Sequence, residues 1–318
     1  MLHIDKIFLE IECCLVKTFR SFLISFPLLA TLCGVGIAAE TASLNTAQIE
    51  QVTGLKGSLN EEEGVFKVTV PRSDVPISVD GWRMPAFMGL TSWAAFTKGK
   101  KAEAMVMGDL VLMQDEVNPV MSAALDGGLS VTALHNHFFY DEPKVYFMHI
   151  GGEGTTEKLA AGVKAALDKE KEVRAAAPEL PKSFGKPFAP EKNAITGAAI
   201  DTVLGSKGQA KDGMFKVTIG RKATMPCGCE VATEMGINTW AGFAGTDQDA
   251  LVDGDFVMLE SELQPVLKSL RKDGINIVAI HNHMTAEEPR YLFLHYWGRG
   301  PAAELAKAVK NALNETAR

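Results

Sequence analysis

Apolar and polar residues alternate along several short stretches of this chain, and longer stretches between them repeat apolar residues at a spacing of about four. Alternation with many β-branched and aromatic residues is typical of strands with one buried face. The spacing of Leu159, Val163 and Leu167 is typical of an amphipathic helix lying on a core. In the first half of the chain the pattern predicts strands at 65–70, 89–97, 104–113, 129–137 and 144–151.

A further helix is predicted in each half from its capping residues. Asp115 and Ser261 are residue types whose side chains accept hydrogen bonds from the free amides of a first helical turn. Pro119 and Pro265 would then fall in that first turn, where no amide donor is missed. Strands outnumber helices, so the sequence predicts an α+β fold in which a mixed or antiparallel sheet carries a few packed helices.

The whole pattern occurs twice, which indicates a tandem duplication. The segment 66–70 (FKVTV) recurs at 215–219 (FKVTI), and 88–96 (MGLTSWAAF) recurs at 235–243 (MGINTWAGF). Between the copies, residues 175–192 contain four prolines, which favours a stiff, extended linker. The predicted organisation is therefore a leader with a signal peptide at 1–39, a first copy at 40–174, a linker at 175–192 and a second copy at 193–318.

The N-terminal region has the layout of a secretory signal. Lys17 and Arg20 precede an uncharged apolar run at 21–39 that ends with small residues. We therefore expect a periplasmic or secreted protein with no membrane span after cleavage. Cys33 suggests lipid attachment, but the large Leu32 before it makes a poor lipobox, so an anchor is not favoured.

Composition narrows the class of partner. The formal charge is −7, and Lys and Arg are scattered, so the sequence gives no reason to expect a nucleic-acid partner. A small-molecule ligand is compatible with the composition, and the oligomeric state is not indicated. After removal of the signal the chain keeps only Cys227 and Cys229, so it is not a disulfide scaffold. The pair is compatible with a soft Cu(I) site, a strained disulfide or a turn with two free thiols.

Every histidine of the expected mature protein belongs to one of two matching triads. They are His135, His137 and His149 in the first copy, and His281, His283 and His295 in the second. Residues at i and i+2 of a strand share a face, and a following strand can bring the third histidine to it. Three imidazoles about 2.1 Å from one ion leave a coordination position open, and zinc is the expected metal.

Matched carboxylates are candidates for proton transfer beside such an ion. They are Glu116 and Glu262 near the predicted helix starts, and Glu142 and Glu288 before matched prolines. Glu116 and Glu262 equally suit a favourable interaction with a helix N-terminus, and Glu142 and Glu288 equally suit a solvated turn. Asp109 and Asp255 follow glycines and are interpreted as turn formers.

The chain resembles the LppY/LpqO family of exported bacterial proteins. The resemblance rests on segments 67–72 (KVTVPR), 92–96 (SWAAF), 116–120 (EVNPV) and the repeated histidine blocks. It implies export and duplication but brings no established reaction. The histidine spacing is also similar to the zinc site of acetolactate decarboxylase and to the first cupin motif, although a second cupin motif is absent.

Taken together, the sequence predicts an exported metal-binding protein. One reading is a zinc-dependent enzyme acting on a small carbonyl or carboxylate compound. The alternatives are a non-catalytic metal- or ligand-binding protein of the cell envelope, and a structural module that metal ions staple together. A cleft and a carboxylate beside each triad would favour the first.

Overall fold

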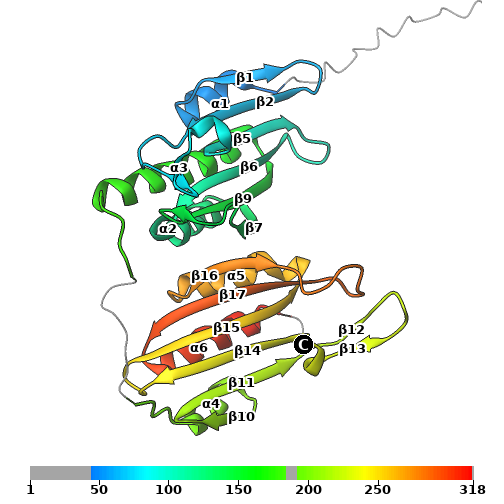
Figure 1. Cartoon of the computed structure of the whole chain (residues 1–318). Coiled ribbons are helices and arrows are strands. Elements are labelled where there is room, and N and C mark those ends of the chain that lie inside the picture. The colour runs from blue at the N-terminus through cyan, green and yellow to red at the C-terminus, as the bar shows by residue number, and fades with distance from the viewer. Residues whose placement is uncertain (1–43, 184–191, 317–318) are drawn as a thin grey trace, which may run out of the picture. The chain divides into compact units, whose positions relative to one another are not determined.

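The computed structural model describes residues 44–183 and 192–316. The predicted signal peptide and part of the predicted linker lie outside these residues. Both copies belong to one compact unit, and the fold is α+β (Figure 1). No helix in the described residues has the length and apolar composition needed to cross a bilayer.

The first copy is built on antiparallel strands with helices on one face (Figure 1). Its elements are α1 (Thr46–Thr53), β1 (Gly57–Asn60), β2 (Val65–Pro71), β3 (Ser78–Val79), β4 (Trp82–Arg83), η1 (Ala86–Met88), β5 (Thr91–Lys98), β6 (Ala104–Met113), α2 (Gln114–Asp126), β7 (Ser130–His135), β8 (Asp141–Glu142), β9 (Val145–Gly154) and α3 (Thr156–Ala176).

The second copy repeats this order, except that it has the turn η3 before its middle helix and no strand that matches β8. Its elements are α4 (Gly197–Leu204), β10 (Gly208–Lys211), β11 (Met214–Gly220), β12 (Ala223–Thr224), β13 (Glu230–Val231), η2 (Thr233–Met235), β14 (Asn238–Gly245), β15 (Ala250–Leu259), η3 (Glu260–Glu262), α5 (Leu263–Lys272), β16 (Asn276–His281), β17 (Tyr291–Gly300) and α6 (Ala302–Asn314).

Within the described residues the two copies share one sheet of twelve strands. Its order is β1-β2-β5-β6-β9-β7-β16-β17-β15-β14-β11-β10, so the second copy runs through the same order in reverse. The junction is a single antiparallel pair, Leu134 of β7 with Ile280 of β16. The edge strand β7 of the first copy and the edge strand β16 of the second copy therefore lie side by side in the sheet.

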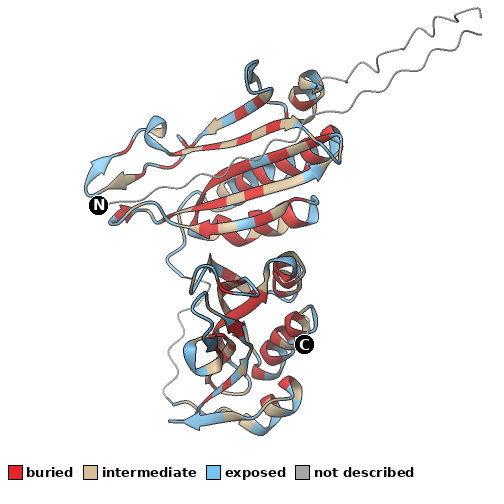
Figure 2. Ribbon diagram, turned by 90° about the vertical axis from the view of Figure 1, so that its right-hand side faces the viewer, coloured by how far each residue is buried: buried red, intermediate tan, exposed pale blue. Residues whose placement is uncertain are grey.

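The main core lies between the sheet and the helices, where buried residues of both copies form one cluster. Figure 2 shows these buried positions along the sheet-facing sides of the helices. On the opposite face each copy has a smaller apolar cluster, which includes Val111 and Phe147 in the first copy and Val257 and Phe293 in the second. The long central strands β6 and β15 are therefore covered on both faces, which explains their nearly continuous apolar sequences.

The structure moves two predicted helix starts. Helix α2 begins at Gln114 after Met113, and the turn matching it begins after Leu259, so Asp115 and Ser261 lie inside the first turn and are not caps. Pro119 therefore falls in the second turn of α2. In both copies the third residue of the turn is a glutamate. Its carboxylate accepts a hydrogen bond from the backbone N–H of the residue that precedes the turn, and this bond takes the place of the predicted cap. These bonds are Met113 N to Glu116 Oε2 and Leu259 N to Glu262 Oε2, both 2.8 Å.

Candidate metal centre

Each histidine triad lies on the sheet face opposite the helices. In the second copy His281 ends β16 and His295 lies in β17, whose register sets Ala279 opposite His295 and His281 opposite Phe293. His283 lies just beyond β16, and its ring stacks on Phe293 with centroids 3.6 Å apart. The apolar ring beneath His283 fixes the direction of that imidazole.

A buried aspartate adjoins the second triad. Asp255 of β15 pairs directly with His295 of β17 and is 3% exposed. Its Oδ2 lies 3.0 Å from His283 Nε2 and 3.9 Å from His281 Nε2. Ligand atoms of Asp255, His281 and His295 all lie within 4.8 Å of one another. In the second copy Asp255, His281 and His295 therefore form one compact group of ligand atoms, and His283 adjoins this group through Asp255.

Backbone carbonyls orient two of these imidazoles. His283 Nδ1 donates to the Gly236 carbonyl at 3.1 Å, and His295 Nδ1 donates to the Gly254 carbonyl at 3.4 Å. A carbonyl oxygen only accepts, so the proton lies on Nδ1 and the lone pair on Nε2. A partner on the far ring nitrogen is a usual feature of histidine ligands to metals. This arrangement presents Nε2 of His283 and His295 as ligand atoms.

Burial lowers the pKa of three triad imidazoles, His281, His135 and His137. Desolvation, followed by the neighbouring His295 and His283, lowers the pKa of His281 to about 4. Desolvation also lowers the pKa of His135 and His137 in the first copy. For Asp255, desolvation raises the pKa, and its Oδ1 has no hydrogen-bond partner in the described structure. A buried carboxylate is stabilised by a nearby positive charge, which a bound cation would supply at Asp255.

The first triad has the same plan. Asp109 of β6 pairs with His149 of β9, and His137 stacks on Phe147 with centroids 3.4 Å apart. The Nε2 atoms of His135 and His149 face each other at 3.0 Å. Oδ1 of Asp109 is also buried without a hydrogen-bond partner. Both copies therefore bring together the three histidines that the sequence grouped, next to an aspartate of the neighbouring strand. In the described residues only the second copy brings the ligand atoms of that aspartate and two imidazoles within 4.8 Å of one another.

The interpretation of Asp109 and Asp255 as turn formers is wrong, because both lie inside long strands. The glycine before each serves close packing. A Cβ atom on Gly254 would lie 2.3 Å from the Tyr296 ring and 2.4 Å from the Trp240 carbonyl. The sequence signal that could have found these acids is a Gly-Asp pair kept at the same place in both copies.

Glu116 and Glu262 do not belong to the triads. Glu116 is fully buried, and its carboxylate accepts hydrogen bonds from Arg72 and Arg174 as well as from the backbone of Met113. Glu262 is paired with Arg221 at 2.5 Å. Their carboxylates join the start of a helix to a neighbouring arginine, which is a structural role. The carboxylate beside each triad is Asp109 or Asp255 instead.

Glu142 and Glu288 are exposed, each before a cis proline. The buried acids of these loops are their neighbours: Asp141 accepts from Val145 N at 2.8 Å, and Glu287 accepts from Tyr291 N at 2.9 Å. Among the described residues no hydrogen bond or ion pair links Glu142 or Glu288 to a triad histidine. Both remain candidates by sequence position alone.

A cavity of about 650 Å³ opens beside the second triad. Asp255 and His283 lie at one side of it, and Trp240 and Lys216 lie on the adjoining strands. Its lining is Lys207, Gln209, Lys216, Thr218, Thr233, Glu234, Gly236, Asn238, Trp240, Asp255 and His283. The acid Glu234 was not singled out by the sequence. The second site therefore has room for a small molecule next to its carboxylate and imidazole.

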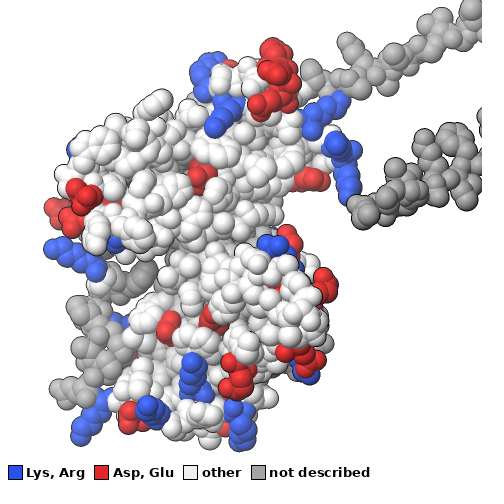
Figure 3. Space-filling model, turned by 45° about the vertical axis from the view of Figure 1, so that its right-hand side comes forward, with Lys and Arg blue, Asp and Glu red and all other residues white. Residues whose placement is uncertain are grey.

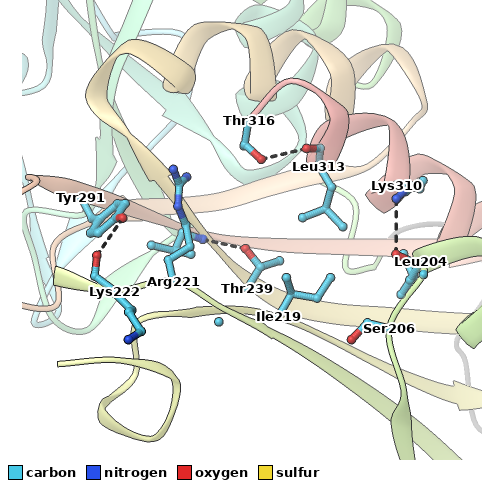
Figure 4. Close-up of a pocket in the computed structure, with 13 residues that line it drawn as sticks. Leu204, Ser206, Ile219, Arg221, Lys222, Thr239, Tyr291, Lys310, Leu313 and Thr316 are labelled. Atoms are coloured by element: carbon cyan, nitrogen blue, oxygen red, sulfur yellow. Dashed lines mark hydrogen bonds between the residues drawn. The ribbon is translucent and has the colours of Figure 1, made fainter. Parts of the chain in front are cut away.

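A separate cavity of about 590 Å³ lies in the second copy, with Leu204 and Leu313 on its walls (Figure 4). Tyr291 Oη donates to the Lys222 carbonyl at 3.0 Å, and Thr316 Oγ1 donates to the Leu313 carbonyl at 2.8 Å at its edge. No triad residue is among those that line it. It is thus distinct from the candidate metal centre.

The loops around the two triads differ in polarity. Phe87, Phe139 and Tyr140 of the first copy are 95%, 82% and 78% exposed. Their counterparts in the duplicated sequence are Glu234, Thr285 and Ala286. On the face seen in Figure 3, acidic and basic side chains form small separate groups in both copies, with uncharged surface between them. The two sites therefore have similar centres and different surroundings.

Cys227 and Cys229 are free and exposed in the turn between β12 and β13. A hydrogen bond from Cys229 lowers the pKa of Cys227. The hairpin is joined to the loop after His283 by backbone hydrogen bonds between Thr224 and Glu288 of 2.8 and 2.9 Å. The pair is a turn with two thiols near the triad loop.

Comparison with known proteins identifies a family of undetermined activity. A search of curated proteins finds no match. One solved structure, described as a trimeric bacterial microcompartment shell protein PduB, shares 10% identity over 80% of this chain and 88% of its own, with a TM-score of 0.22. So low a TM-score supports no inference about this chain. The family model Domain of Unknown Function (DUF1259) matches residues 47–169 and again 198–315, one match in each copy. The chain therefore belongs to the DUF1259 family and carries two tandem copies of its domain.

Proposed function

We propose that this chain is an exported metal-binding protein of the LppY/LpqO type, in which His281, His283, His295 and Asp255 bind one divalent ion. Zinc is the expected metal, because it accepts imidazole and carboxylate ligands and can take a further ligand as a fifth donor. The observation that carries the proposal is the buried Asp255 carboxylate 3.0 Å from His283 Nε2 within a group of histidines. Donor atoms around a tetrahedral zinc are about 3.4 Å apart, given bonds of about 2.1 Å.

The first copy supports a second site of the same kind. His135, His137, His149 and Asp109 occupy the matching strand positions, and two imidazole nitrogens face each other at 3.0 Å. An ion between them would replace one hydrogen bond by two coordinate bonds. We therefore propose two metal sites in the chain, one in each copy.

The cavity beside Asp255 and His283 favours an enzyme or a ligand-binding protein over a module that metal ions only staple. A stapling site needs no access for a small molecule, whereas a catalytic zinc keeps one position open to water or substrate. We propose that the ion polarises an oxygen of a small carbonyl or carboxylate compound. Glu288, Glu142 and Glu234 are the exposed acids from which a proton donor or acceptor would come.

The test is the metal content of the purified mature protein after incubation with zinc, measured by plasma mass spectrometry. We expect about two ions per chain in the wild type and about one in the Asp255→Asn and His295→Ala variants, because a lost ligand typically weakens a zinc site severely. Asp253→Asn is the matched control, since Asp253 is an exposed acid two residues earlier in the same strand.

Two results would contradict the proposal. One is a wild-type protein that takes up no zinc, copper, iron, manganese or nickel. The other is equal metal content in the Asp255→Asn, His295→Ala and Asp253→Asn variants. Circular dichroism of each variant would establish that a change in metal content does not follow from unfolding.

A further inference from the structure

Beside the second triad, a lysine and a tryptophan form one wall of the sheet-face cavity. Trp240 of β14 pairs directly with Asp255 of β15, so the two side chains stand next to each other on the same face. Lys216 of β11 leans along the sheet, and its Nζ lies 4.0 Å from the centre of the Trp240 ring. Lys216, Trp240, Asp255 and His283 line the same cavity, so the ammonium group borders the space beside the proposed metal site.

The charge of Lys216 is available to a ligand. Its ammonium group lies over the tryptophan ring, and none of the ion pairs among the described residues involves Lys216. By contrast, Lys207 at the same cavity is paired with Asp201 at 3.2 Å, and Lys222 outside it is paired with Glu230 at 2.8 Å. An ammonium over a ring keeps hydrogen-bond donors that point away from it. Lys216 can therefore donate into the cavity.

The first copy has the same arrangement on its own strands. Lys67 Nζ lies 4.3 Å from the centre of the Trp93 ring, and Trp93 pairs directly with Asp109. An exposed lysine over a tryptophan is a common surface contact by itself. Here it recurs at matching strand positions in both copies, although many other surface residues differ between them. The recurrence points to a task shared by the two sites.

We infer that the second site binds a short carboxylate in which an oxygen group at one end meets the metal and a carboxylate at the other end pairs with Lys216. This rests on the proposed metal function of Asp255 and the triad. The ligand has to reach both groups within this one cavity of about 650 Å³, which suits a short dicarboxylate or oxo acid. Trp240 forms the wall along which the carbon chain lies.

The experiment titrates the zinc-loaded protein with succinate and with butyrate by isothermal calorimetry. The two probes have the same number of carbons, and butyrate lacks the second carboxylate. We expect succinate to bind more tightly, and Lys216→Met to weaken succinate binding by about tenfold or more, because a hydrogen bond between charged groups is lost. Binding of butyrate should change little, and Lys216→Arg should restore part of the affinity for succinate.

Lys222→Met is the matched control, since this exposed lysine of the same copy does not line the cavity. Metal content is measured on the same samples, which separates the two proposals. Zinc-loaded protein that binds no succinate, or that binds it equally in the Lys216→Met and Lys222→Met variants, would overturn the carboxylate site and leave the metal function standing. Failure to take up metal would overturn the metal function. In that case succinate is titrated into the metal-free wild type and Lys216→Met variant, and equal or absent binding would overturn the carboxylate site as well.

Discussion

In each copy an arginine pairs with the glutamate at the start of the middle helix, and in the first copy this pair has additional charged neighbours. Arg72 is 3% exposed and donates to the Val111 carbonyl and to Glu116, each at 2.7 Å, and also to Asp74. Glu170 of α3 lies 3.3 Å from the same guanidinium, and its Oε2 has no hydrogen-bond partner among the described residues. Three acids thus share one arginine, and burial raises the pKa of Glu170 to about 7.

This predicts a pH-dependent loss of stability that Glu170→Gln removes. In the unfolded chain Glu170 ionises near its ordinary pKa of 4.5, and in the folded protein it ionises near 7. Between these values the folded state binds more protons, so stability falls as the pH rises through this window. Glutamine does not titrate. The unfolding free energy of the variant minus that of wild type should therefore be about 1–3 kcal/mol larger at pH 8 than at pH 5.

Urea unfolding at the two pH values measures this difference. Glu172→Gln is the control, because Glu172 lies on the same helix, is exposed and pairs with Lys169 at 2.6 Å. The same pH dependence in wild type and in Glu170→Gln would show that Glu170 is already ionised in the folded protein.

At the scale of the element, the long strands β6 and β15 hold the two sites in place. Each carries core residues on its helix-facing side and, on its other side, one aspartate directly beside the histidine of the next strand. The glycine before the aspartate lets a neighbouring side chain cross close to the strand. In the second copy that side chain is Tyr296, whose Oη donates to the Trp240 carbonyl at 2.9 Å. Packing of Tyr296 on the helix-facing side of β15 therefore helps to position the Asp255 carboxylate on the opposite side.

Gly254→Ala should disturb both the packing of Tyr296 and the position of Asp255. The new Cβ would lie 2.3 Å from the Tyr296 ring and 2.4 Å from backbone, so the strand or the tyrosine must move. We expect a loss of about 1–3 kcal/mol in unfolding free energy, typical of overpacking, together with weaker metal uptake in the second copy. Gly300→Ala is the matched control, because no atom lies within 4 Å of its added Cβ. Equal stability of the two variants would argue against close packing at Gly254.

At the scale of the whole molecule, the two copies are joined by matched side chains. Asn118 of the first copy donates to the Ile277 carbonyl at 3.1 Å and accepts from Ile277 N at 2.7 Å. Gln264 of the second copy makes the same two bonds with Val131, at 2.7 and 2.9 Å. Val131 and Ile277 both stand at irregularities in the strand register. Each copy thus satisfies the backbone groups that a bulge leaves unpaired in the other.

Asn118→Ala should therefore destabilise the protein more than its small size suggests. It leaves the N–H and C=O of Ile277 without these partners at a buried position, which costs about 1–3 kcal/mol for each unsatisfied group. Urea unfolding measures the loss, with Asn136→Ala as control because Asn136 is exposed and makes one long bond of 3.4 Å to Phe138. Equal midpoints for the two variants would contradict a role for Asn118 in joining the copies.

The sequence was most informative where the signal is local. Enrichment in β-branched and aromatic residues predicted β2, β5, β6 and β9 to within a few residues. Apolar residues at a spacing of four predicted α3, and Leu305, Val309 and Leu313 at the same spacing predicted α6. The short elements α1 and β1, with their counterparts α4 and β10, were not predicted. Asn45 and Gly54, which cap α1, were visible in the sequence, but a helix of this length depends on the sheet against which Ile49 packs.

The sequence by itself determined the duplication, the α+β class and the grouping of the histidines in threes, because repetition and strand periodicity are written along the chain. The tertiary structure alone decided which carboxylate joins each triad. Asp255 and His295 are far apart in sequence, and only the register of β15 with β17 sets them side by side. The same holds for Lys216 over Trp240 and for Asn118 with Ile277. Contacts between strands depend on pairing register and on the opposite face of the sheet, which no local pattern encodes.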